Sequence, residues 1–365
     1  MIPVFKPIIV SSDIKAAVNA LKRGEISGTF GKSIIELEKN YSRYIGTKYA
    51  VSVTSGSTAL HLAIAALELP KGSEIIVSAT TNIASALAIT HNNCVPIPVD
   101  SNKDTWNINT DLIKKFITKK TKAIMAVHFL GNPANMLEIN KIAKKNGLYV
   151  IEDAAEAHGA DIHGKKTGSF GIAGCFSFYA NKAITCGEGG IITTNNKKYY
   201  EKLKLYRNLG FTIPRFVHYI QGFNFRMTGY QAAIVNNQLK RINEINKTKI
   251  KISSLYYKYL KNVDGITFQT TSKNNTNVFW MIGLLLNNKY KLSKNKLKEK
   301  LKQKKIETRD FFKSIAGQPC FSGIIKKKTP ISDYLWKNGI YLPSSYDISE
   351  KEIKRICDVI RKYSR

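Results

Sequence analysis

The sequence has few cysteines, few acidic residues and no long apolar run. Its five cysteines (Cys94, Cys175, Cys186, Cys320 and Cys357) are odd in number and form no CxxC pair, so they indicate neither a zinc module nor a disulfide framework. No apolar run approaches the roughly 18 residues of a membrane span. The first ten residues, MIPVFKPIIV, lack the basic start and sustained apolar stretch of a signal peptide. We therefore expect a soluble cytoplasmic protein with reduced thiols.

The shortage of acidic residues leaves a large positive charge. The 365 residues include 57 Lys and Arg against 26 Asp and Glu, while 43% of the chain is apolar, which is typical of a folded protein. Residues 1–239 carry 28 cations and 16 anions, and residues 240–365 carry 29 cations and 10 anions. Of the cations, 47 are lysine and 10 arginine, whereas sites that read bases or clamp phosphates favour arginine. The excess therefore fits a solvated surface better than a nucleic-acid or membrane patch.

Short apolar runs alternate with helical patterns through the first half of the chain. Helices are expected from Ser11, Ser12 or Asp13 to Leu21 and from Lys32 to Tyr44. The runs that predict strands are 49–53, 74–78, 94–100, 122–127, 148–153, 175–179 and 190–194. Strands that alternate with helices favour an α/β architecture with a largely parallel sheet.

The last third of the chain has a different pattern. A long helical stretch begins near Glu201, is interrupted between Gly210 and Gly222, and resumes over 231–260. A strand pattern (277–286), a lysine-rich amphipathic helix (293–305) and a terminal helix (349–363) follow. We expect a large domain, residues 1–240, and a smaller α+β domain, residues 241–365.

Polar residues that carry chemistry follow the predicted strands. Asp153 ends one apolar run, and Lys182 follows another 29 residues later. Ligands of open parallel sheets gather at the carboxyl ends of the strands. A lysine and a carboxylate there suit pyridoxal phosphate, because the lysine supplies a Schiff base and the carboxylate keeps the pyridine nitrogen protonated. The same two residues also occur as an ordinary surface ion pair, so this pattern alone leaves both interpretations open.

A small-residue turn, TSGSTALHLAIAAL (54–67), leads directly into an apolar helix. Free N–H groups at a helix start, together with the hydroxyls of Ser57 and Thr58, form a phosphate-binding arrangement. An ordinary helix cap has the same composition. The phosphate-site interpretation of this turn is favoured over the helix-cap interpretation only when it is combined with Lys182 and Asp153.

These motifs together resemble one family. The segments TSGSTALHLA, EDAAEAHGADIHGKKTGSFGIAGCFSFYANKAITCGEGGIITTN (152–195) and GFNFRMTGYQAA (222–233) are similar to the DegT/DnrJ/EryC1/StrS nucleotide-sugar aminotransferases. The similarity runs from GTFGKSIIELEKNY (28–41) to GIYLPSSYDIS (339–349). Within the family, EDAAE and NKAITCGEGG most resemble the perosamine synthases. The resemblance implies the type I aminotransferase fold of pyridoxal phosphate enzymes, with a mixed, mostly parallel sheet flanked by helices and a smaller α+β C-terminal domain.

The resemblance also implies residue roles. Lys182 would bind the cofactor and relay the proton, and Asp153 would pair with the pyridinium nitrogen. Asn224 would reach the phosphate from the partner subunit of a homodimer. The remaining phosphate-binding residues implied by the family are Ser57, Thr58 and Ser177.

Two positions depart from the family pattern. Glu156 stands where many relatives have glutamine, as it does in perosamine synthases. A carboxylate beside the cofactor's phenolate is unfavourable unless one of them holds a proton, so we expect Glu156 to have a raised pKa. Asn82 stands where relatives usually have an aromatic ring stacked on the cofactor, and it offers only a partial planar contact.

Other polar residues are assigned less specifically. Arg309 and Phe311 match an ETRPFF pattern, with Asp310 in place of proline, and are expected to line the substrate cleft, although a surface position for Arg309 fits as well. Arg226 is expected either to contact the diphosphate or to brace the dimer. His158 and His163 have no nearby third ligand, so no metal site is expected.

The expected activity is amination of a nucleotide-linked 4-keto-6-deoxyhexose at carbon 4, with glutamate as donor. Amination at carbon 3 or of an octulosonate is the alternative, and dehydrating relatives have histidine in place of the lysine. A non-catalytic basic protein that binds nucleic acid is the alternative from another class. The expected partners are the nucleotide sugar, glutamate and a second copy of the chain, with no nucleic acid and no membrane.

Overall fold

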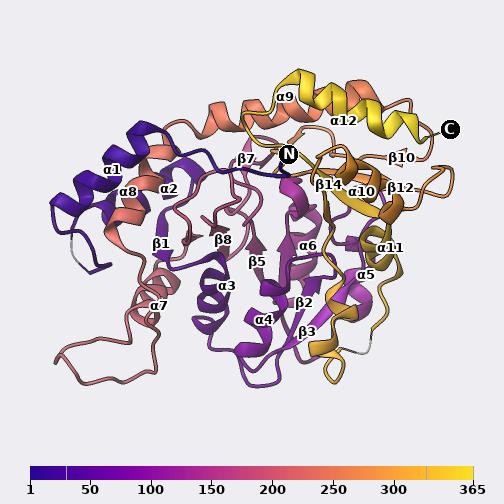
Figure 1. The fold of residues 1–365 in the computed structure, drawn as a ribbon. Helices are drawn as coiled ribbons and strands as arrows, with labels where there is room; N and C mark the ends of the chain where they lie inside the picture. The colour runs from indigo at the N-terminus through magenta and orange to yellow at the C-terminus, as the bar shows by residue number, and fades with distance from the viewer. Residues whose placement is uncertain (30, 326, 365) are drawn as a thin grey trace.

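The computed structural model describes residues 1–29, 31–325 and 327–364. A seven-stranded sheet forms the centre of the molecule, with helices on both faces (Figure 1). The strand order is β1-β9-β8-β5-β4-β2-β3, and within this sheet β9 runs in the direction opposite to the other six strands. The strands are β1 (Tyr49–Val53), β2 (Glu74–Ser78), β3 (Val95–Val99), β4 (Thr121–Val127), β5 (Tyr149–Asp153), β8 (Ala173–Ser177) and β9 (Gly190–Thr194). The predicted mixed, mostly parallel α/β sheet is confirmed.

Twelve α-helices are seen in the described residues. They are α1 (Ser11–Lys22), α2 (Ser33–Ile45), α3 (Gly56–Ala65), α4 (Ile83–His91), α5 (Thr110–Ile113), α6 (Met136–Asn146), α7 (Lys197–Arg207), α8 (Gly229–Leu239), α9 (Ile242–Leu260), α10 (Lys294–Gln303), α11 (Pro330–Asn338) and α12 (Glu350–Lys362). The 3-10 turns are η1 (Lys114–Phe116), η2 (Phe129–Gly131), η3 (Ile315–Gly317) and η4 (Pro319–Phe321). Across the described ranges, no helix is both long and apolar enough to cross a membrane.

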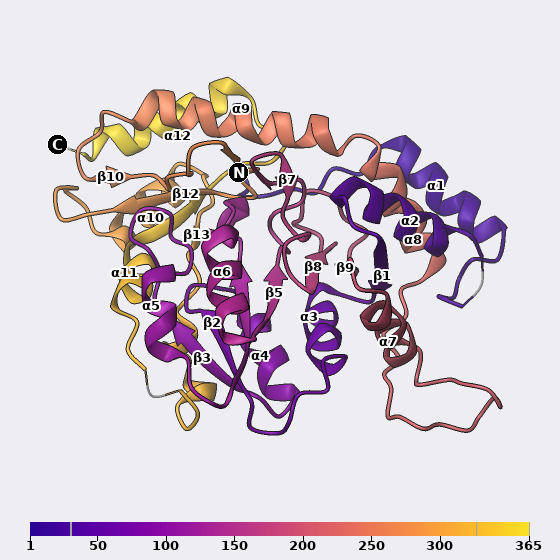
Figure 2. The ribbon, with the colours of Figure 1, turned by 180° about the vertical axis from the view of Figure 1, so that it is seen from behind.

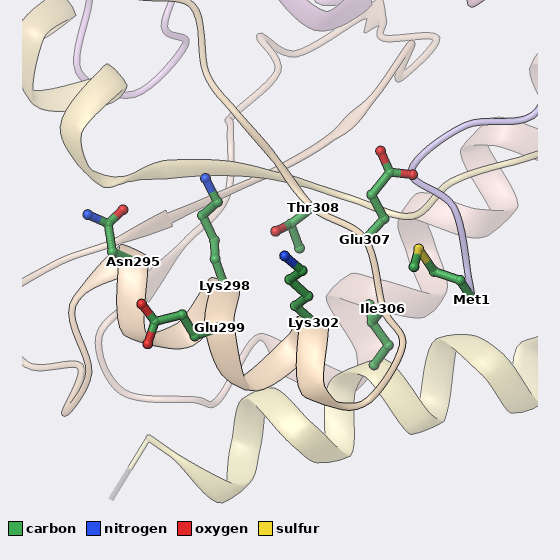
Figure 3. A pocket seen from close by; sticks show the side chains of 8 residues that line it. All are labelled: Met1, Asn295, Lys298, Glu299, Lys302, Ile306, Glu307 and Thr308. Atoms are coloured by element: carbon green, nitrogen blue, oxygen red, sulfur yellow. The ribbon is translucent and has the colours of Figure 1, made fainter.

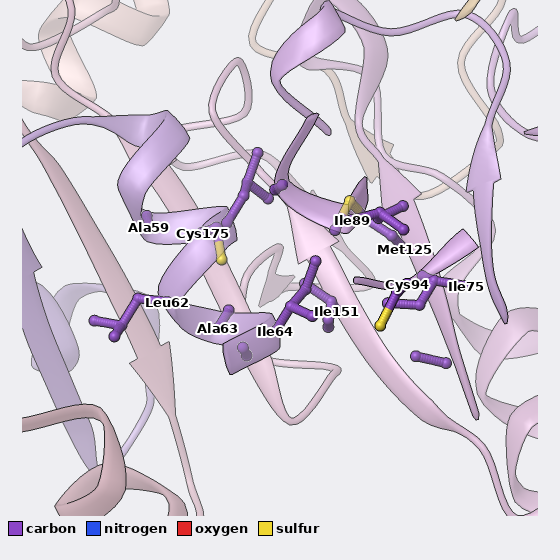
Figure 4. Close-up of a cluster of buried hydrophobic side chains, with 14 of the residues drawn as sticks. Ala59, Leu62, Ala63, Ile64, Ile75, Ile89, Cys94, Met125, Ile151 and Cys175 are labelled. Atoms are coloured by element: carbon purple, nitrogen blue, oxygen red, sulfur yellow. The ribbon is translucent and has the colours of Figure 1, made fainter. Parts of the chain in front are cut away.

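The apolar core lies on both faces of the sheet because successive strand side chains point to opposite sides. Ile75 and Val77 of β2 pack in the cluster under α3 and α4, which Figure 4 shows in part. Ile76, between them, packs on the other face with residues of α6. Each strand of the centre is thus buried on both sides, which explains its nearly continuous apolar sequence.

A second, four-stranded sheet lies in the C-terminal part. Its order is β10-β12-β14-β13, and all its pairs are antiparallel. The strands are β10 (Ile266–Thr267), β12 (Ile282–Leu286), β13 (Arg309–Asp310) and β14 (Gly339–Leu342). A small third sheet joins β6 (Asp161–Ile162), β7 (Lys165–Lys166) and β11 (Asn275–Thr276).

Helices α9 and α12 pack together and lie side by side in both views (Figure 1, Figure 2). The N-terminal residues also join this part, because Ile2 pairs with Ile306 in a parallel bridge. We propose that residues 1–240 and residues 241–365 form two domains.

Several predicted boundaries were wrong for local reasons. The first helix begins at Ser11, but Asp13 lies inside its first turn, where the carboxylate accepts a hydrogen bond from the Val10 N–H at 3.0 Å. The predicted helix 231–260 is two helices, α8 and α9, that meet at Lys240 and Arg241. The predicted strand 277–286 is extended only over β12, because Phe279 has a φ of 49°, in the left-handed region.

The segment between α7 and α8 extends away from the body as a long loop (Figure 2). Three of its apolar side chains are strongly exposed, Ile213 at 95%, Phe216 at 73% and Tyr219 at 73%. At its base, Asn208 and Asn224 form an antiparallel bridge. We call residues 211–222 the arm.

Candidate active site

The carboxyl ends of β5 and β8 meet the start of α3 around a cavity of about 280 Å³. We call it the strand-end cavity. Seven of the predicted site residues line it: Ser57, Asn82, Asp153, Glu156, Ser177, Lys182 and Arg309. The tertiary structure thus brings together residues from five separate parts of the sequence, as a parallel sheet does at this edge.

Lys182 follows β8 and lies almost buried, with 9% of its surface exposed. Its Nζ is 3.9 Å from Glu156 Oε1 and 3.9 Å from the centroid of the Trp280 ring. Burial lowers the pKa of Lys182, and the charges of Glu156 and Asp153 oppose that change. A lysine with a lowered pKa has more of the neutral form that attacks a carbonyl group.

Asp153 ends β5, and α4 holds its carboxylate in place. Ser85 donates a hydrogen bond to Asp153 Oδ2 at 2.7 Å, and the Ala155 N–H donates to Oδ1 at 3.2 Å. Ser85 also bonds Thr81, at 2.8 Å. Sequence reasoning missed Ser85, although a lone serine in the apolar helix that follows Asn82 was a visible signal.

Glu156 is buried and accepts a hydrogen bond from the Leu130 N–H at 2.9 Å. Leu130 has a φ of 60°, an uncommon conformation for a branched side chain. Burial raises the pKa of Glu156 to about 7, against a lowering by Lys182. The raised pKa was expected from repulsion by the cofactor's phenolate, and burial acts in the same direction.

The start of α3 forms a small recess beside Ser177. A Cβ atom added to Gly56 would lie 2.6 Å from Ser177 Cβ, so only glycine allows the helix to approach this strand end. Ser55 caps the helix by accepting from the Thr58 N–H at 3.1 Å. Ser57 is exposed to the cavity. Free N–H groups, two hydroxyls and the positive end of the helix dipole here suit a phosphate group.

Thr58 does not line the cavity, contrary to its predicted role as a phosphate ligand. Its hydroxyl donates to the Ser55 carbonyl at 2.9 Å and accepts from the Ser55 N–H at 2.9 Å. The hydroxyl therefore completes the helix cap and has turned away from the recess.

The two residues predicted to line the substrate cleft, Arg309 and Phe311, lie differently. Phe311 is 2% exposed and packs against Trp106 and Tyr341 in the core, so it does not line the cavity. Phe312 lines the cavity instead. Arg309 also lines it, with its Nε 3.4 Å from Glu307 Oε1.

Three predicted residues lie elsewhere or have another role. Asn224 is exposed at the base of the arm, and Arg226 donates to Asn208 Oδ1 at 2.8 Å; neither lines the cavity of its own chain. Asn82 lines the cavity, but its side-chain oxygen caps α4 by accepting from the Ala84 N–H at 3.0 Å. His158 is not placed to bind metal.

His158 is buried between α2 and β8. Its Nε2 lies 2.8 Å from the Ser177 carbonyl oxygen and its Nδ1 lies 2.8 Å from the Tyr41 hydroxyl. Burial lowers the pKa of His158 to about 3, so the ring is neutral and donates to Ser177 while it accepts from Tyr41. Among the described residues, no group of three or more His, Cys, Asp or Glu side chains is placed to hold a metal ion.

Trp280, Phe312 and Tyr341 are among the further lining residues to which sequence reasoning assigned no role. Trp280 and Tyr341 come from the C-terminal part, which closes one side of the cavity. Their positions depend on tertiary packing: Tyr341 belongs to the family-like segment 339–349, but that segment does not indicate that its side chain faces the cavity.

A larger hollow of about 410 Å³ lies at the surface beside α10 and contains none of the predicted site residues (Figure 3). Its lining mixes two lysines, two glutamates and apolar groups from the N-terminus and the strand segment before β13. The convergent polar groups that a reaction needs are in the strand-end cavity.

The residues present fit pyridoxal phosphate. The close approach that Gly56 permits brings the start of α3 beside Ser177, where a phosphate fits, and a nearly buried lysine and an anchored aspartate lie in the same cavity. Together the fold and the site define a pyridoxal phosphate-dependent aminotransferase of the type I fold. The sequence model of the DegT/DnrJ/EryC1/StrS aminotransferase family matches residues 7–361, and the chain belongs to this family.

Individual relatives are similar to this chain over nearly its whole length. GDP-perosamine synthase of Escherichia coli O157:H7 is 36% identical over 99% of this chain and 98% of its own. The dTDP-3-amino-3,6-dideoxy-alpha-D-galactopyranose transaminase of Aneurinibacillus thermoaerophilus is 33% identical over 96% and 95%. The solved structure of DesV from S. venezuelae superimposes with a TM-score of 0.91 at 28% identity, and covers 97% of this chain and 94% of that one.

Proposed function

We propose that this protein transfers the amino group of glutamate to carbon 4 of a nucleotide-linked 4-keto-6-deoxyhexose. The observation that carries the transamination is the convergence of Lys182, Asp153 and Glu156 on one cavity at the strand ends. The similarity to GDP-perosamine synthase supports the choice of substrate and position. The presence of Lys182 in the cavity and the family assignment both argue against a non-catalytic, nucleic-acid-binding role.

Each site residue has a defined task in this proposal. The bound cofactor supplies an electron sink for the substrate carbon. Lys182 holds the cofactor and, when free, moves a proton at the amino-bearing carbon. Asp153, fixed by Ser85, keeps the ring nitrogen protonated. Ser57, Ser177 and the N–H groups at the start of α3 bind the phosphate.

Two substrates use the same cavity in turn. Glutamate gives up its amino group and leaves as 2-oxoglutarate, and the keto sugar then receives it. Arg309 is exposed at the cavity wall, and its Nε and Nη2 each lie 3.4 Å from Glu307 Oε1, so it is available to an anionic group of either substrate.

We also propose that the working form is a homodimer with shared sites. Asn224 does not face its own cavity, and the apolar side chains of the arm project into solvent. An apolar face of α1, with Ile14, Val18 and Leu21 at 56%, 41% and 47% exposure, adds a second uncovered surface. Exposed patches of this kind are typical of protein interfaces.

Amination at another carbon is the second candidate. The Aneurinibacillus thermoaerophilus relative, whose name specifies a 3-amino sugar, is 33% identical. An octulosonate substrate would need the same chemistry.

A substrate panel tests the proposal. GDP-, UDP- and dTDP-linked 4-keto-6-deoxyhexoses and 3-keto sugars are incubated with glutamate, and products are identified by mass spectrometry and NMR. We expect a 4-amino sugar from at least one 4-keto substrate and no product with Lys182→Ala. A 3-amino product alone would replace the proposed position with the second candidate, and turnover by Lys182→Ala would end the mechanism.

A further inference from the structure

Trp280 lies directly against the lysine of the strand-end cavity. The Lys182 Nζ is 3.9 Å from the centroid of the Trp280 ring, and the two side chains are 9% and 6% exposed. An ammonium group within about 6 Å of a tryptophan face is attracted by the ring's electrons, most strongly where water is excluded. The contact therefore favours the charged form of the lysine.

The ring is held in place by groups other than Lys182. Its Nε1 donates to the Asn181 carbonyl at 2.8 Å, and the backbone N–H of Trp280 donates to the Leu130 carbonyl at 2.9 Å. Phe279, just before it, has a φ of 49°. A side chain fixed at both ends is already in position before the lysine is released from the cofactor.

The nearest carboxyl group does not provide Lys182 with a constant attraction. Glu156 lies 3.9 Å from its Nζ, but because its pKa is about 7 the carboxyl is partly protonated near neutral pH. Asp153 also attracts the ammonium, and its carboxylate accepts a hydrogen bond from Ser85. His158 is neutral above a pKa of about 3. The ring of Trp280 attracts the ammonium at every pH.

We propose that Trp280 is a positioning residue for Lys182: its ring holds and stabilises the ε-ammonium whenever the lysine is not bound to the cofactor, and so controls how readily the lysine releases its proton. This inference rests on the role of Lys182 in the proposed function. It assigns to the C-terminal part of the chain a direct influence on the proton relay.

Two substitutions separate the ring from the other contacts of Trp280. Trp280→Phe and Trp280→Leu both lose the Nε1 bond to Asn181, and only Trp280→Phe keeps an aromatic face. Trp280→Met replaces Trp280→Leu if the leucine variant does not fold, as judged by circular dichroism and thermal unfolding. The comparison between phenylalanine and the aliphatic variant then isolates the contribution of the ring.

The test uses the enzyme with its cofactor converted to the amino form by glutamate, in which Lys182 is free. Trace acetic anhydride is applied between pH 6 and pH 10, and acetylation of Lys182 is measured by mass spectrometry. Lys251, an exposed lysine on α9, serves as the internal reference. The midpoint of the Lys182 labelling curve is expected to fall by about one pH unit in Trp280→Leu and by less in Trp280→Phe, with Lys251 unchanged.

Equal midpoints in the wild type and the aliphatic variant would overturn the inference, as would equal shifts in the phenylalanine and aliphatic variants. The proposed function is tested separately by Lys182→Ala. If that variant is inactive while the midpoints are equal, only the role of Trp280 fails. If Lys182→Ala turns over, the proposed function fails first.

Discussion

Glu156 is the residue whose ionisation depends most on the fold. It is buried with a pKa near 7, whereas an exposed glutamate has a pKa near 4.5. A raised pKa in the folded state contributes stability that is fully present below pH 4.5 and is lost as the pH rises through 7. Protonation of the Glu156 carboxyl group is therefore linked to the free energy of unfolding of the protein.

Glu156→Gln should remove this pH dependence. In protein freed of cofactor, we expect the free energy of unfolding of the wild type to fall between pH 4.5 and pH 7.5 relative to the variant, by an amount on the order of 3 kcal/mol. Urea unfolding of both proteins at several pH values measures the difference. Parallel curves across this range would show that Glu156 does not titrate as described.

Ser85 holds Asp153 through a hydrogen bond to a charged acceptor, at 2.7 Å. Bonds of this kind contribute about 1.5–3 kcal/mol, so Ser85→Ala should weaken pyridoxal phosphate binding by roughly 10-fold or more. Equilibrium titration with the cofactor, followed by visible absorption, checks this. Ser254→Ala, on the outer face of α9, is the control and should bind as the wild type does.

Helix α3 depends on one glycine for its close approach to the sheet. Gly56→Ala would place a Cβ 2.6 Å from Ser177 Cβ, so the helix start must move and the phosphate recess must change shape. We expect cofactor affinity to fall by 100-fold or so and the thermal midpoint to decrease by several degrees. Gly323→Ala, where an added Cβ meets no atom within 4 Å, is the matched control.

If Gly56→Ala and Gly323→Ala bind the cofactor equally well, the recess at α3 is not the phosphate site. Spectroscopic titration and differential scanning calorimetry of the two variants decide this. The comparison controls for the general effect of replacing a glycine.

At the scale of the whole molecule, complementation between two inactive variants tests whether the active sites of the proposed dimer are shared. Lys182→Ala chains and Asn224→Ala chains should each be inactive or severely impaired alone. A mixed dimer holds one site in which both Lys182 and the partner's Asn224 are intact. Refolding an equimolar mixture should therefore restore about one quarter of wild-type activity.

Light scattering of the purified protein gives the accompanying control, since a monomeric protein excludes a shared site. Absence of recovery in a mixture that does form dimers would show that Asn224 acts within its own chain or not at all. Arm variants such as Phe216→Asp are expected to reduce dimer formation, because Phe216 is 73% exposed in the single chain.

The sequence by itself determined the central sheet, with several strands placed to the residue, because strands buried on both faces need uninterrupted apolar runs. It also determined the principal candidates, Lys182 and Asp153, because residues at strand ends converge at one edge of a parallel sheet. Local sequence similarity to the family indicated the cofactor and the reaction.

The tertiary structure alone decided which side chains complete the site. Thr58 became part of a helix cap, Phe311 became core, and Trp280 entered the cavity from a predicted strand that the positive φ of Phe279 interrupts. Burial raised the pKa of Glu156. The Thr58 cap is a local contact with Ser55, but the other features depend on contacts between segments distant in sequence, and such contacts exist only after the chain has packed.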